Sequence, residues 1–456
     1  MTDFHQSAHA VPIESVEQLV EQLHHAGKPR AEWKIGTEYE KVVVERATGR
    51  AAPFSGARGI EAVLRALAER HGWEPKEEDG RTVALARGGA TITLEPGGQL
   101  ELSGAQFATL HSADEELRTH VREVVGVCAD FGLACLGLGI QPVSRLDEIE
   151  WVPKQRYRIM GPYMTRVGTL GQRMMKQTAT VQANIDYADE RDAMRKLAVG
   201  MGIAPLVNAL FANSPLSDGT LNGYASFRGH IWTDTDRARC GLLPFAFSPS
   251  AGFADYVSWA LDVPLYFILR DGRYRTEVTG IPFRRFLAEG AAGERATLDD
   301  WNLHLTTLFP EVRLKGYIEV RSADSQPPER MLALPALVKG VFYTADCLEA
   351  AWDLVKRWTY EEREALYRDV HRQGLDARCH GIRALELGRE LHAIAEEGLR
   401  RQHALDPAGN DERRYLEPLA EALATGRTPA AELAERWNGA WDRRVERLVA
   451  HTEYRL

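Results

Sequence analysis

Residues 33–45 read WKIGTEYEKVVVE, and the interpretation of the whole chain starts from this stretch. Its side chains alternate with a period of two, which is typical of a β-strand because successive residues on a strand point to opposite faces. Gly36, Glu38 and Glu40 fall on one face, whereas Tyr39 falls on the other. The stretch therefore predicts a strand that presents two carboxylates on the same face, about 6–7 Å apart.

Two glutamates on one partly buried strand face repel each other unless a cation or a proton compensates their charge. Mg²⁺ is a natural compensator, since it is a hard ion that prefers oxygen ligands and pairs readily with phosphates. An exposed acidic strand face is the alternative interpretation of Glu38 and Glu40, and the strand taken alone does not decide between the two.

A second acidic motif surrounds a tight turn at residues 94–104, which read LEPGGQLELSG. The Pro-Gly-Gly sequence is strong turn chemistry, and its glycines permit the close approach of a ligand. Glu95 and Glu101 flank the turn, and Gln99 shares a strand face with Glu101. An ordinary hairpin with surface acids has the same pattern. If the hairpin pairs with the first strand, four carboxylates converge, and two or more Mg²⁺ ions are then expected.

Polar and basic residues supply further candidates. A strand predicted at residues 178–187 has one wholly polar face, which either water or a ligand-binding groove covers. Basic side chains occur at 154–158, at 228–232 (RGHIW) and at Lys315 and Arg321. Arginine binds carboxylates through paired hydrogen bonds, and either basic residue can stabilise a phosphoryl group during transfer. Each of them taken singly is also typical of a charged surface, and the chain has no P-loop motif.

The order of the predicted elements indicates the fold class. Strands are predicted mainly in the first 320 residues, interleaved with helices of irregular length, and loops and short elements are expected at 141–176. This distribution favours an α+β fold with a mostly antiparallel sheet over the regular alternation of a doubly wound fold. We find no repeat and no linker, so residues 1–456 are expected to form one catalytic unit. Its sheet-bearing core spans about 30–325, and 328–456 form a helical region.

Composition narrows the class of partner. The 456 residues carry a formal charge of −9, from 65 acidic and 56 basic side chains, which argues against nucleic acid or an anionic membrane as a partner. No stretch approaches the roughly 20 apolar residues that span a bilayer, and the N-terminus does not read as a secretory signal. Five cysteines without a C-x-x-C pair indicate neither a zinc site nor a disulfide framework, and we expect a cytoplasmic protein.

Several long motifs together resemble the plant and proteobacterial type of glutamate–cysteine ligase, known as glutamate–cysteine ligase family 2. They follow the family's order between about residues 33 and 440. The motifs are GTEYEK (36–41), LEPGGQLELSGA (94–105), PKQRYRIMGPYM (153–164), VGTLG (167–171), TVQANID (180–186), LFANSP (210–215), RGHIWTDTD (228–236), LHLTTLFPEVRLK (303–315) and YIEVRSAD (317–324). Two departures stand out, because the Glu-His-Glu triplet of plant members reads Glu38-Tyr39-Glu40 here, and Ser325-Gln326-Pro327 replaces a Gly-Gly-Pro-like stretch.

The resemblance implies a central six-stranded antiparallel sheet that forms a funnel-like site, related to the catalytic core of glutamine synthetase. It implies Mg²⁺ and ATP, with glutamate and cysteine as substrates, and a monomer or homodimer is expected. The implied metal ligands are Glu38, Glu40, Glu95, Glu101, Glu319 and Asn184. The implied catalytic residues are Arg228, Arg321 and Lys315, the implied substrate-binding residues are Arg158, Tyr163, Arg228, Trp232 and Gln99, and the implied ATP-binding residues are Gln182 and Lys315.

The implied reaction is the first step of glutathione biosynthesis. An amide bond from a free carboxylate is uphill, so ATP must first phosphorylate the γ-carboxylate of glutamate, and the cysteine amine then attacks the γ-glutamyl phosphate. One alternative is a ligase of the same fold that takes another amine acceptor or serves another thiol pathway. The other is a non-catalytic nucleotide- or metal-binding regulator, which would bind ATP without glutamate-dependent release of ADP.

Overall fold

The largest sheet of the computed structural model, which describes residues 11–455, has nine strands. They follow the order β14-β15-β7-β1-β5-β4-β3-β2, with β6 paired to the far half of β1, and every pair is antiparallel. The bounds are β1 Ile35–Glu45, β2 Glu74–Glu78, β3 Arg81–Arg87, β4 Ala90–Leu94, β5 Leu100–Ser103, β6 Leu133–Leu136, β7 Thr180–Ile185, β14 Val312–Leu314 and β15 Ile318–Asp324. The predicted α+β fold with an antiparallel sheet is confirmed, with nine strands in place of the six that the resemblance implied.

Strand β1 occupies the middle of the sheet because both of its edges pair with other strands. Its residues from Ile35 to Val44 are all buried. The first half of β1 pairs with β7 on one side and with β5 on the other, and the second half pairs with β6. Tyr39 belongs to the main hydrophobic core, whereas Glu38 and Glu40 line a cavity on the opposite face. The strand predicted at residues 33–45 is therefore confirmed.

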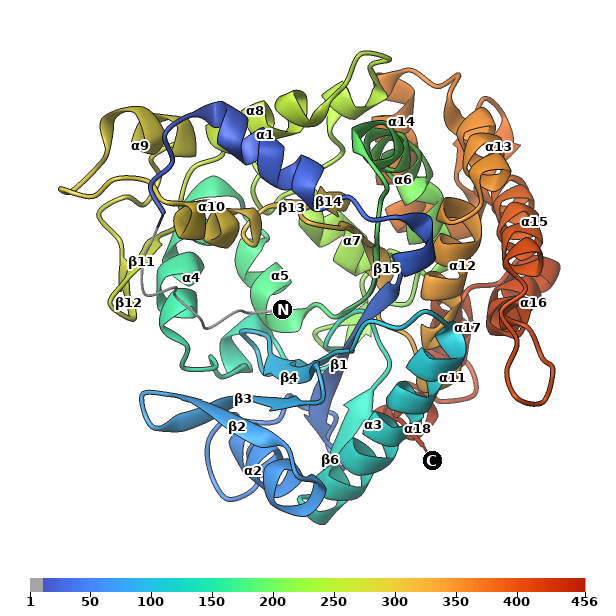
Figure 1. The fold of residues 1–456 in the computed structure, drawn as a ribbon. Coiled ribbons are helices and arrows are strands. Elements are labelled where there is room, and N and C mark those ends of the chain that lie inside the picture. Colours follow the sequence, from blue (N-terminus) through green and yellow to red (C-terminus); the bar gives the residue numbers. More distant parts are fainter. Residues whose placement is uncertain (1–10, 456) are drawn as a thin grey trace.

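Helices cover the core face of the sheet. Helix α6 (Glu190–Leu210) packs on β14 and β15, α12 (Ala333–Phe342) on β7, α2 (Ile60–His71) on β3 and α3 (Leu110–Asp130) on β6. Figure 1 shows α12, α13 (Ala345–Val355), α15 (Ala384–Gln402) and α16 (Glu417–Thr425) gathered along one side of the molecule. The C-terminal region also contains α11 Pro328–Met331, α14 Tyr360–Gln373, α17 Pro429–Asn438 and α18 Val445–Thr452, which confirms the predicted helical region.

A second set of elements faces the carboxylate side of the sheet. It contains α4 (Gln155–Val167), α5 (Gly171–Gln177), α7 (Phe227–Trp232), α10 (Leu298–Leu305) and a hairpin of β11 (Ile268–Arg270) and β12 (Arg273–Arg275). Loops and short elements were expected at 141–176, so α4 and α5 are more regular than predicted. The other elements are α1 Val16–His25, α8 Phe253–Asp262, α9 Phe283–Glu289, β8 Leu216–Ser217, β9 Thr220–Leu221, β10 Cys240–Gly241, β13 Phe309–Pro310, β16 Arg378–Cys379 and β17 Ile382–Arg383.

One hydrophobic core joins the sheet to the C-terminal helices, since it includes Val181 of β7 as well as Leu337 of α12 and Leu391 of α15. All five cysteines are free thiols. Among residues 11–455, no single helix is both long and apolar enough to cross a membrane, although the bent pair Pro328–Phe342 and Ala345–Val355 meets the length and composition criteria together.

Candidate active site

A cavity of about 560 Å³ opens over the sheet face that carries Glu38 and Glu40. Strands β1, β4, β5, β7, β14 and β15 contribute residues to its floor, and α4, α5, α7, α10 and the β11–β12 hairpin contribute to its walls. Nine of the residues singled out in the sequence line this cavity: Glu38, Glu40, Glu95, Glu101, Gln182, Arg228, Trp232, Lys315 and Arg321. The sheet therefore brings together residues that lie up to nearly 290 positions apart in the chain.

Strand register sorts the charges on this face into an acidic and a basic end. Glu40 of β1 lies directly opposite Glu101 of β5. Along the other half of the sheet, Arg313 of β14 lies opposite Glu319 of β15, which in turn lies opposite Asn184 of β7. Because side chains at paired positions of neighbouring strands share a face, the acidic and basic groups face the same cavity from opposite sides.

Three carboxylates form the acidic end. One carboxylate oxygen each of Glu40, Glu95 and Glu101 lies within 4.8 Å of the other two. Glu101 is oriented by the hydroxyl of Thr93, which donates to Oε2 at 2.8 Å, and Glu40 accepts at 2.9 Å from the backbone N–H of Thr180. An all-carboxylate set at this spacing fits a hard divalent cation such as Mg²⁺.

The electrostatics of the acidic end favour a bound cation. Burial raises the pKa of Glu40 well above its usual value, and the charges of Glu95 and Glu101 raise it further. Burial also raises the pKa of Glu38, with the charges of Glu319 and Glu101 acting in the same direction. Negative charge is thus concentrated where water is scarce, which is costly unless a positive ion compensates it.

A second oxygen-rich position lies next to the three carboxylates. The side-chain amide of Asn184 donates from Nδ2 to Oε1 of Glu38 at 2.9 Å. Among the described residues, Oδ1 of Asn184 is buried and has no hydrogen-bond partner. A buried oxygen that accepts no hydrogen bond, next to a carboxylate, is well suited to bind a cation or to accept a hydrogen bond from a ligand.

Glu319 lies in a different environment from the other predicted metal ligands. It is completely buried, and its carboxylate accepts two hydrogen bonds of 2.8 Å from Arg313 and one of 2.5 Å from Arg321. Lys315 Nζ lies 3.4 Å from the same carboxylate. Although burial acts to raise it, Arg313, Lys315 and Arg321 hold the pKa of Glu319 well below its usual value. Glu319 therefore organises the basic end of the cavity.

The basic end presents several donors to the cavity. Arg321 donates from Nη1 to Oε1 of Gln182 at 2.6 Å, and Arg228 donates from Nη2 to the carbonyl of Arg321 at 2.9 Å. Lys315 is almost enclosed, and burial together with the charge of Arg313 lowers its pKa to about 8. Trp232 packs beside Phe309 with ring centroids 5.7 Å apart, and within the described part of the chain its buried indole N–H has no partner. These groups can receive an anionic ligand.

The structure adds three basic residues that were not among the predicted site residues. Arg313 lines the cavity together with Lys315. The two residues are two positions apart, so the period of a strand places them on the same face, and this spacing could have revealed Arg313 in the sequence. Lys154 lines it too, donating from Nζ to the carbonyl of Leu94 at 2.9 Å, and burial lowers its pKa to about 8. The buried Nε of Arg156, also in the lining, has no partner among the described residues.

Three predicted substrate-binding residues lie outside the cavity. Arg158 is exposed, although it shares α4 with the cavity residues Tyr157 and Met160. Tyr163 is buried against Tyr266, with ring centroids 4.8 Å apart. Gln99 stabilises the local backbone by donating from Nε2 to the carbonyls of Met175 and Thr178 at 3.2 and 2.7 Å. Arg158, Tyr163 and Gln99 therefore do not line this cavity, whereas Arg156 and Lys154 do.

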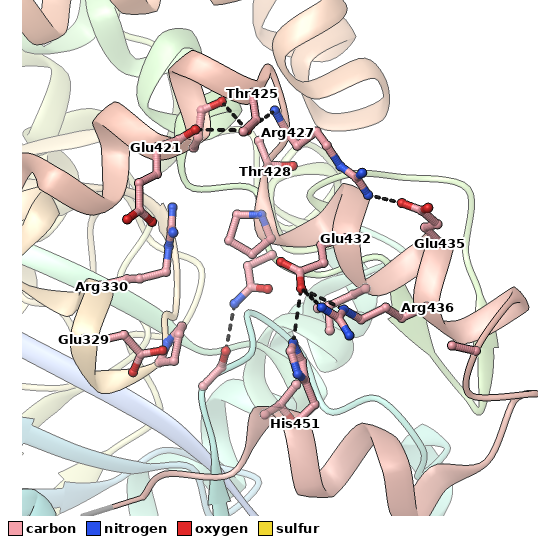
Figure 2. Close-up of a pocket in the computed structure, with 18 of the residues that line it drawn as sticks. Glu329, Arg330, Glu421, Thr425, Arg427, Thr428, Glu432, Glu435, Arg436 and His451 are labelled. Atoms are coloured by element: carbon pink, nitrogen blue, oxygen red, sulfur yellow. Dashed lines mark hydrogen bonds and ion pairs between the residues drawn. The ribbon is translucent and has the colours of Figure 1, made fainter.

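A second hollow of about 740 Å³ lies among α16, α17, α18 and the segment around Arg330. Figure 2 shows that most of its charged side chains pair with one another: Arg427 with Glu435, and Arg436 and His451 with Glu432. Its lining contains no set of three converging carboxylates like that of the first cavity. Chemistry rather than volume therefore identifies the cavity over the sheet as the candidate active site.

Comparisons with known proteins agree on the family. The model of the family "Glutamate-cysteine ligase family 2 (GCS2)" matches residues 34–451. The chloroplastic glutamate–cysteine ligase of Brassica juncea is 43% identical over 441 residues, which are 96% of this chain and 84% of the relative. The chloroplastic enzymes of Oryza sativa subsp. indica and Arabidopsis thaliana are each 42% identical over 96% of this chain, and they are covered to 88% and 83% of their own lengths.

A solved structure shares the fold at much lower sequence similarity. The glutamate–cysteine ligase of Francisella tularensis, determined in complex with AMP, aligns with a TM-score of 0.51 at 12% identity. The alignment covers 92% of this chain and 88% of that one. The large antiparallel sheet with its surrounding helices is therefore an architecture that a known ligase also has.

The relatives also correct one expectation. We predicted a cytoplasmic protein, but the curated relatives from Brassica juncea, Medicago truncatula, Solanum lycopersicum and Arabidopsis thaliana are all named as chloroplastic enzymes. Compartment depends on targeting information outside the catalytic core, which composition and cysteine usage do not report. The cytoplasmic prediction is wrong on this comparison. The match of the family model over nearly the whole chain, together with relatives above 40% identity, establishes that the chain belongs to glutamate–cysteine ligase family 2.

Proposed function

We propose that this ligase joins the γ-carboxylate of glutamate to the amine of cysteine at the expense of ATP, with Mg²⁺ as the required ion. Family membership supports the reaction, and one structural observation carries the proposal for the site. Glu40, Glu95 and Glu101 converge at one end of a cavity whose other end holds Arg313, Lys315 and Arg321. Such a division suits a reaction in which a metal-bound polyphosphate and a carboxylate must meet.

The acidic end is the proposed metal site. Glu40, Glu95 and Glu101 would hold one ion, and Glu38 with Oδ1 of Asn184 would hold a second. When bound, Mg²⁺ supplies positive charge that neutralises the phosphates of ATP. In this proposal Glu319 acts mainly through Arg313 and Arg321, because its carboxylate already accepts their hydrogen bonds.

The basic end is the proposed site of phosphoryl transfer. Arg321 and Arg228 would stabilise the charge on the transferring phosphoryl group, since both line the cavity. Arg321 shares the carboxylate of Glu319 with Arg313 and Lys315, and Arg228 makes no ion pair among the described residues. Lys315 would contribute a further positive charge and a contact to ATP. Gln182 orients Arg321 by accepting its hydrogen bond, and its own contact to ATP stays a prediction.

The remaining donors suit the amino-acid substrates. Within residues 11–455, the buried Nε–H of Arg156 and the indole N–H of Trp232 have no hydrogen-bond partner. A substrate carboxylate could accept hydrogen bonds from both the guanidinium and the indole N–H. These donors, which are costly to bury without a partner, would then be satisfied. The amine of the acceptor must lose a proton before it attacks γ-glutamyl phosphate, and positioning of the two substrates should supply much of the rate.

Two observables separate this proposal from its alternatives. Purified protein is incubated with ATP, Mg²⁺ and glutamate, with cysteine, 2-aminobutyrate or other amines added in turn. ADP release is followed, and products are identified by mass. We expect γ-glutamylcysteine to form far faster than any other product. ADP released only with another amine would mean a different acceptor, and ATP binding without glutamate-dependent ADP release would mean a regulator.

A further inference from the structure

A buried carboxylate outside the cavity joins the elements that carry the basic groups. Asp324, the last residue of β15, is 1% exposed and does not line the cavity. Its Oδ2 accepts from the backbone N–H of Asn213 and from the hydroxyl of Ser214, both at 2.7 Å. Its Oδ1 accepts from the hydroxyl of Ser226, also at 2.7 Å. Three donors thus converge on one carboxylate that makes no ion pair among the described residues.

Two of these three donors lead directly to α7. Ser226 caps the N-terminus of α7, since its Oγ accepts from the backbone N–H of Gly229 at 3.0 Å. The Oγ of Ser214 accepts at 3.1 Å from the backbone N–H of Arg228. A six-residue helix has little stability of its own, so its orientation depends on such anchors. Asp324 therefore holds the start of α7, from which the side chains of Arg228 and Trp232 reach the cavity.

A second contact fixes α7 against the same strand. Arg228 donates from Nη2 to the carbonyl of Arg321 on β15 at 2.9 Å. Helix α7 is thus connected to β15 in two places. At Asp324 the connection runs through the hydroxyls of Ser214 and Ser226, and at Arg321 it runs through the side chain of Arg228. These two ties set how far the guanidinium groups of Arg228 and Arg321 lie from each other.

Ser325, the residue after Asp324, connects this end of β15 to the acidic end of the cavity. The hydroxyl of Ser325 donates to the backbone carbonyl of Glu40 at 2.5 Å, and its N–H donates to the carbonyl of Ala179 at 3.0 Å. The space around Asp324 is also closed, because a Cβ on Gly139 would lie 2.6 Å from Cβ and Cγ of Asp324. The corner is therefore packed so that Asp324 has no room to move.

We propose that Asp324 is a positioning residue for the ligase reaction, which acts through Arg228 and makes no contact with substrate. An acceptor-only group is needed there because all three of its partners donate, and a neutral amide would turn one acceptor into a donor. Loss of the carboxylate would let α7 shift, and displacement of a catalytic group by about 1 Å can cost roughly 100-fold in rate. This proposal rests on the proposed function, since Arg228 acts in that reaction.

The test compares two buried carboxylates in the full-length protein. Asp324→Asn removes the proposed positioning group, and Glu412→Gln is the matched control. Glu412 is 1% exposed, does not line the cavity, and accepts from the backbone N–H of Leu110 and from Lys339 Nζ, both at 2.6 Å. We expect both variants to lose thermal stability. Only Asp324→Asn should lower kcat/KM for glutamate, by roughly 100-fold, while Glu412→Gln stays within about 2-fold of the unchanged enzyme.

A double-mutant cycle distinguishes positioning from a purely structural role. In an Arg228→Ala background, Asp324→Asn should cause little further loss of kcat/KM, because the residue through which it acts is already absent. Additive losses, or equal effects of Asp324→Asn and Glu412→Gln on kcat/KM, would overturn the proposal. If Asp324→Asn does not fold, Ser226→Ala, which removes one arm of the same network, replaces it in the cycle. If the protein without any substitution showed no glutamate-dependent ADP release, the proposed function would be refuted. Failure of the proposed function is therefore distinguishable from failure of the positioning role of Asp324.

Discussion

Glu40 is a buried carboxylate at the acidic end of the cavity. Its carboxylate is buried beside those of Glu95 and Glu101, which raises its pKa well above the usual value. Glu40→Gln keeps the shape of the side chain but removes one anionic ligand. We expect the Mg²⁺ concentration for half-maximal ADP release to rise roughly 10- to 100-fold. Glu74→Gln, which removes an exposed carboxylate on β2, is the control of equal charge change, and an unchanged Mg²⁺ dependence in Glu40→Gln would refute the metal site.

His304 makes a separate prediction about acid sensitivity. Its ring is buried and hydrogen-bonds through Nε2 to the carbonyl of Ala260 at 2.8 Å. Burial lowers its pKa to about 3. An unfolded histidine titrates near 6.5, so as the pH falls below that value the unfolded state takes up a proton that the folded state does not, and stability is lost.

The size of this effect can be measured. Between pH 7 and pH 5 a histidine of this kind should cost about 2 kcal/mol of unfolding free energy. His304→Gln should therefore lose less stability over this interval than the unchanged protein, in urea titrations at the two pH values. His25→Gln, the same substitution at an exposed position, is the control. An equal pH dependence in all three proteins would show that His304 has the same pKa in the folded and the unfolded state, and would contradict the prediction.

Individual site residues could be predicted from the sequence where they lie on strands. A period of two places Glu38 and Glu40 on one face without any knowledge of the surroundings, and both line the cavity. Helix α4 behaves differently, because which of its residues faces the cavity depends on how the helix packs. Arg158 was implied by the resemblance, yet Arg156 lines the cavity. The ion pairs of Glu319 could not be predicted either, since they require the register between β14 and β15.

At the scale of elements, strands of the central sheet were easier to predict than the helices over the cavity. β1 has eleven residues, and turn residues bound several of its neighbours, such as the Pro-Gly-Gly between β4 and β5. Helix α4 contains Gly161 and Pro162, which disfavour a helix interior, and α5 has only seven residues. Tertiary packing overrides these local preferences, because both helices cover one wall of the cavity.

The crossing of α12 and α15 offers a test of element packing. A Cβ on Gly398 of α15 would collide with the backbone carbonyl of Gly340 on α12. Gly398→Ala should therefore push the two helices apart and destabilise the protein by about 1–3 kcal/mol. Gly126→Ala in α3 is the matched control, since an added Cβ there meets nothing within 4 Å. That change should stabilise the protein by about 0.5–1 kcal/mol.

Urea denaturation at one pH measures both glycine variants. The two substitutions are chemically identical and both lie inside helices, so helix propensity alone predicts the same gain for each. Opposite signs would establish that the close approach of α12 and α15 determines the outcome. If Gly398→Ala were as stable as Gly126→Ala, the two helices would not be in backbone contact. ADP release by the folded fraction should be unchanged in either variant, because neither residue lines the cavity.

At the scale of the whole molecule, the C-terminal helices are built into the sheet. Tyr343, at the end of α12, donates from its hydroxyl to the carbonyl of Lys34 at 2.5 Å and accepts from the N–H of Asp186 at 2.8 Å. Its own carbonyl accepts from Arg30 at 2.6 Å. The same hydrophobic core contains residues of β7, α12 and α15. The chain should therefore unfold as one unit, in keeping with the prediction that residues 1–456 form a single catalytic unit.

Hydrogen exchange in increasing denaturant tests this cooperativity. Peptides from β1 and from α15 should lose protection at the same urea concentration, because neither element keeps its core without the other. Tyr343→Phe removes the hydroxyl that joins the end of α12 to Lys34, just before β1, and to Asp186, just after β7, so it should lower that concentration for both peptides together. If α15 lost protection first while β1 stayed protected, the helical region would be a separable domain. Contacts such as those of Tyr343 would then be an interface between two domains rather than part of one core.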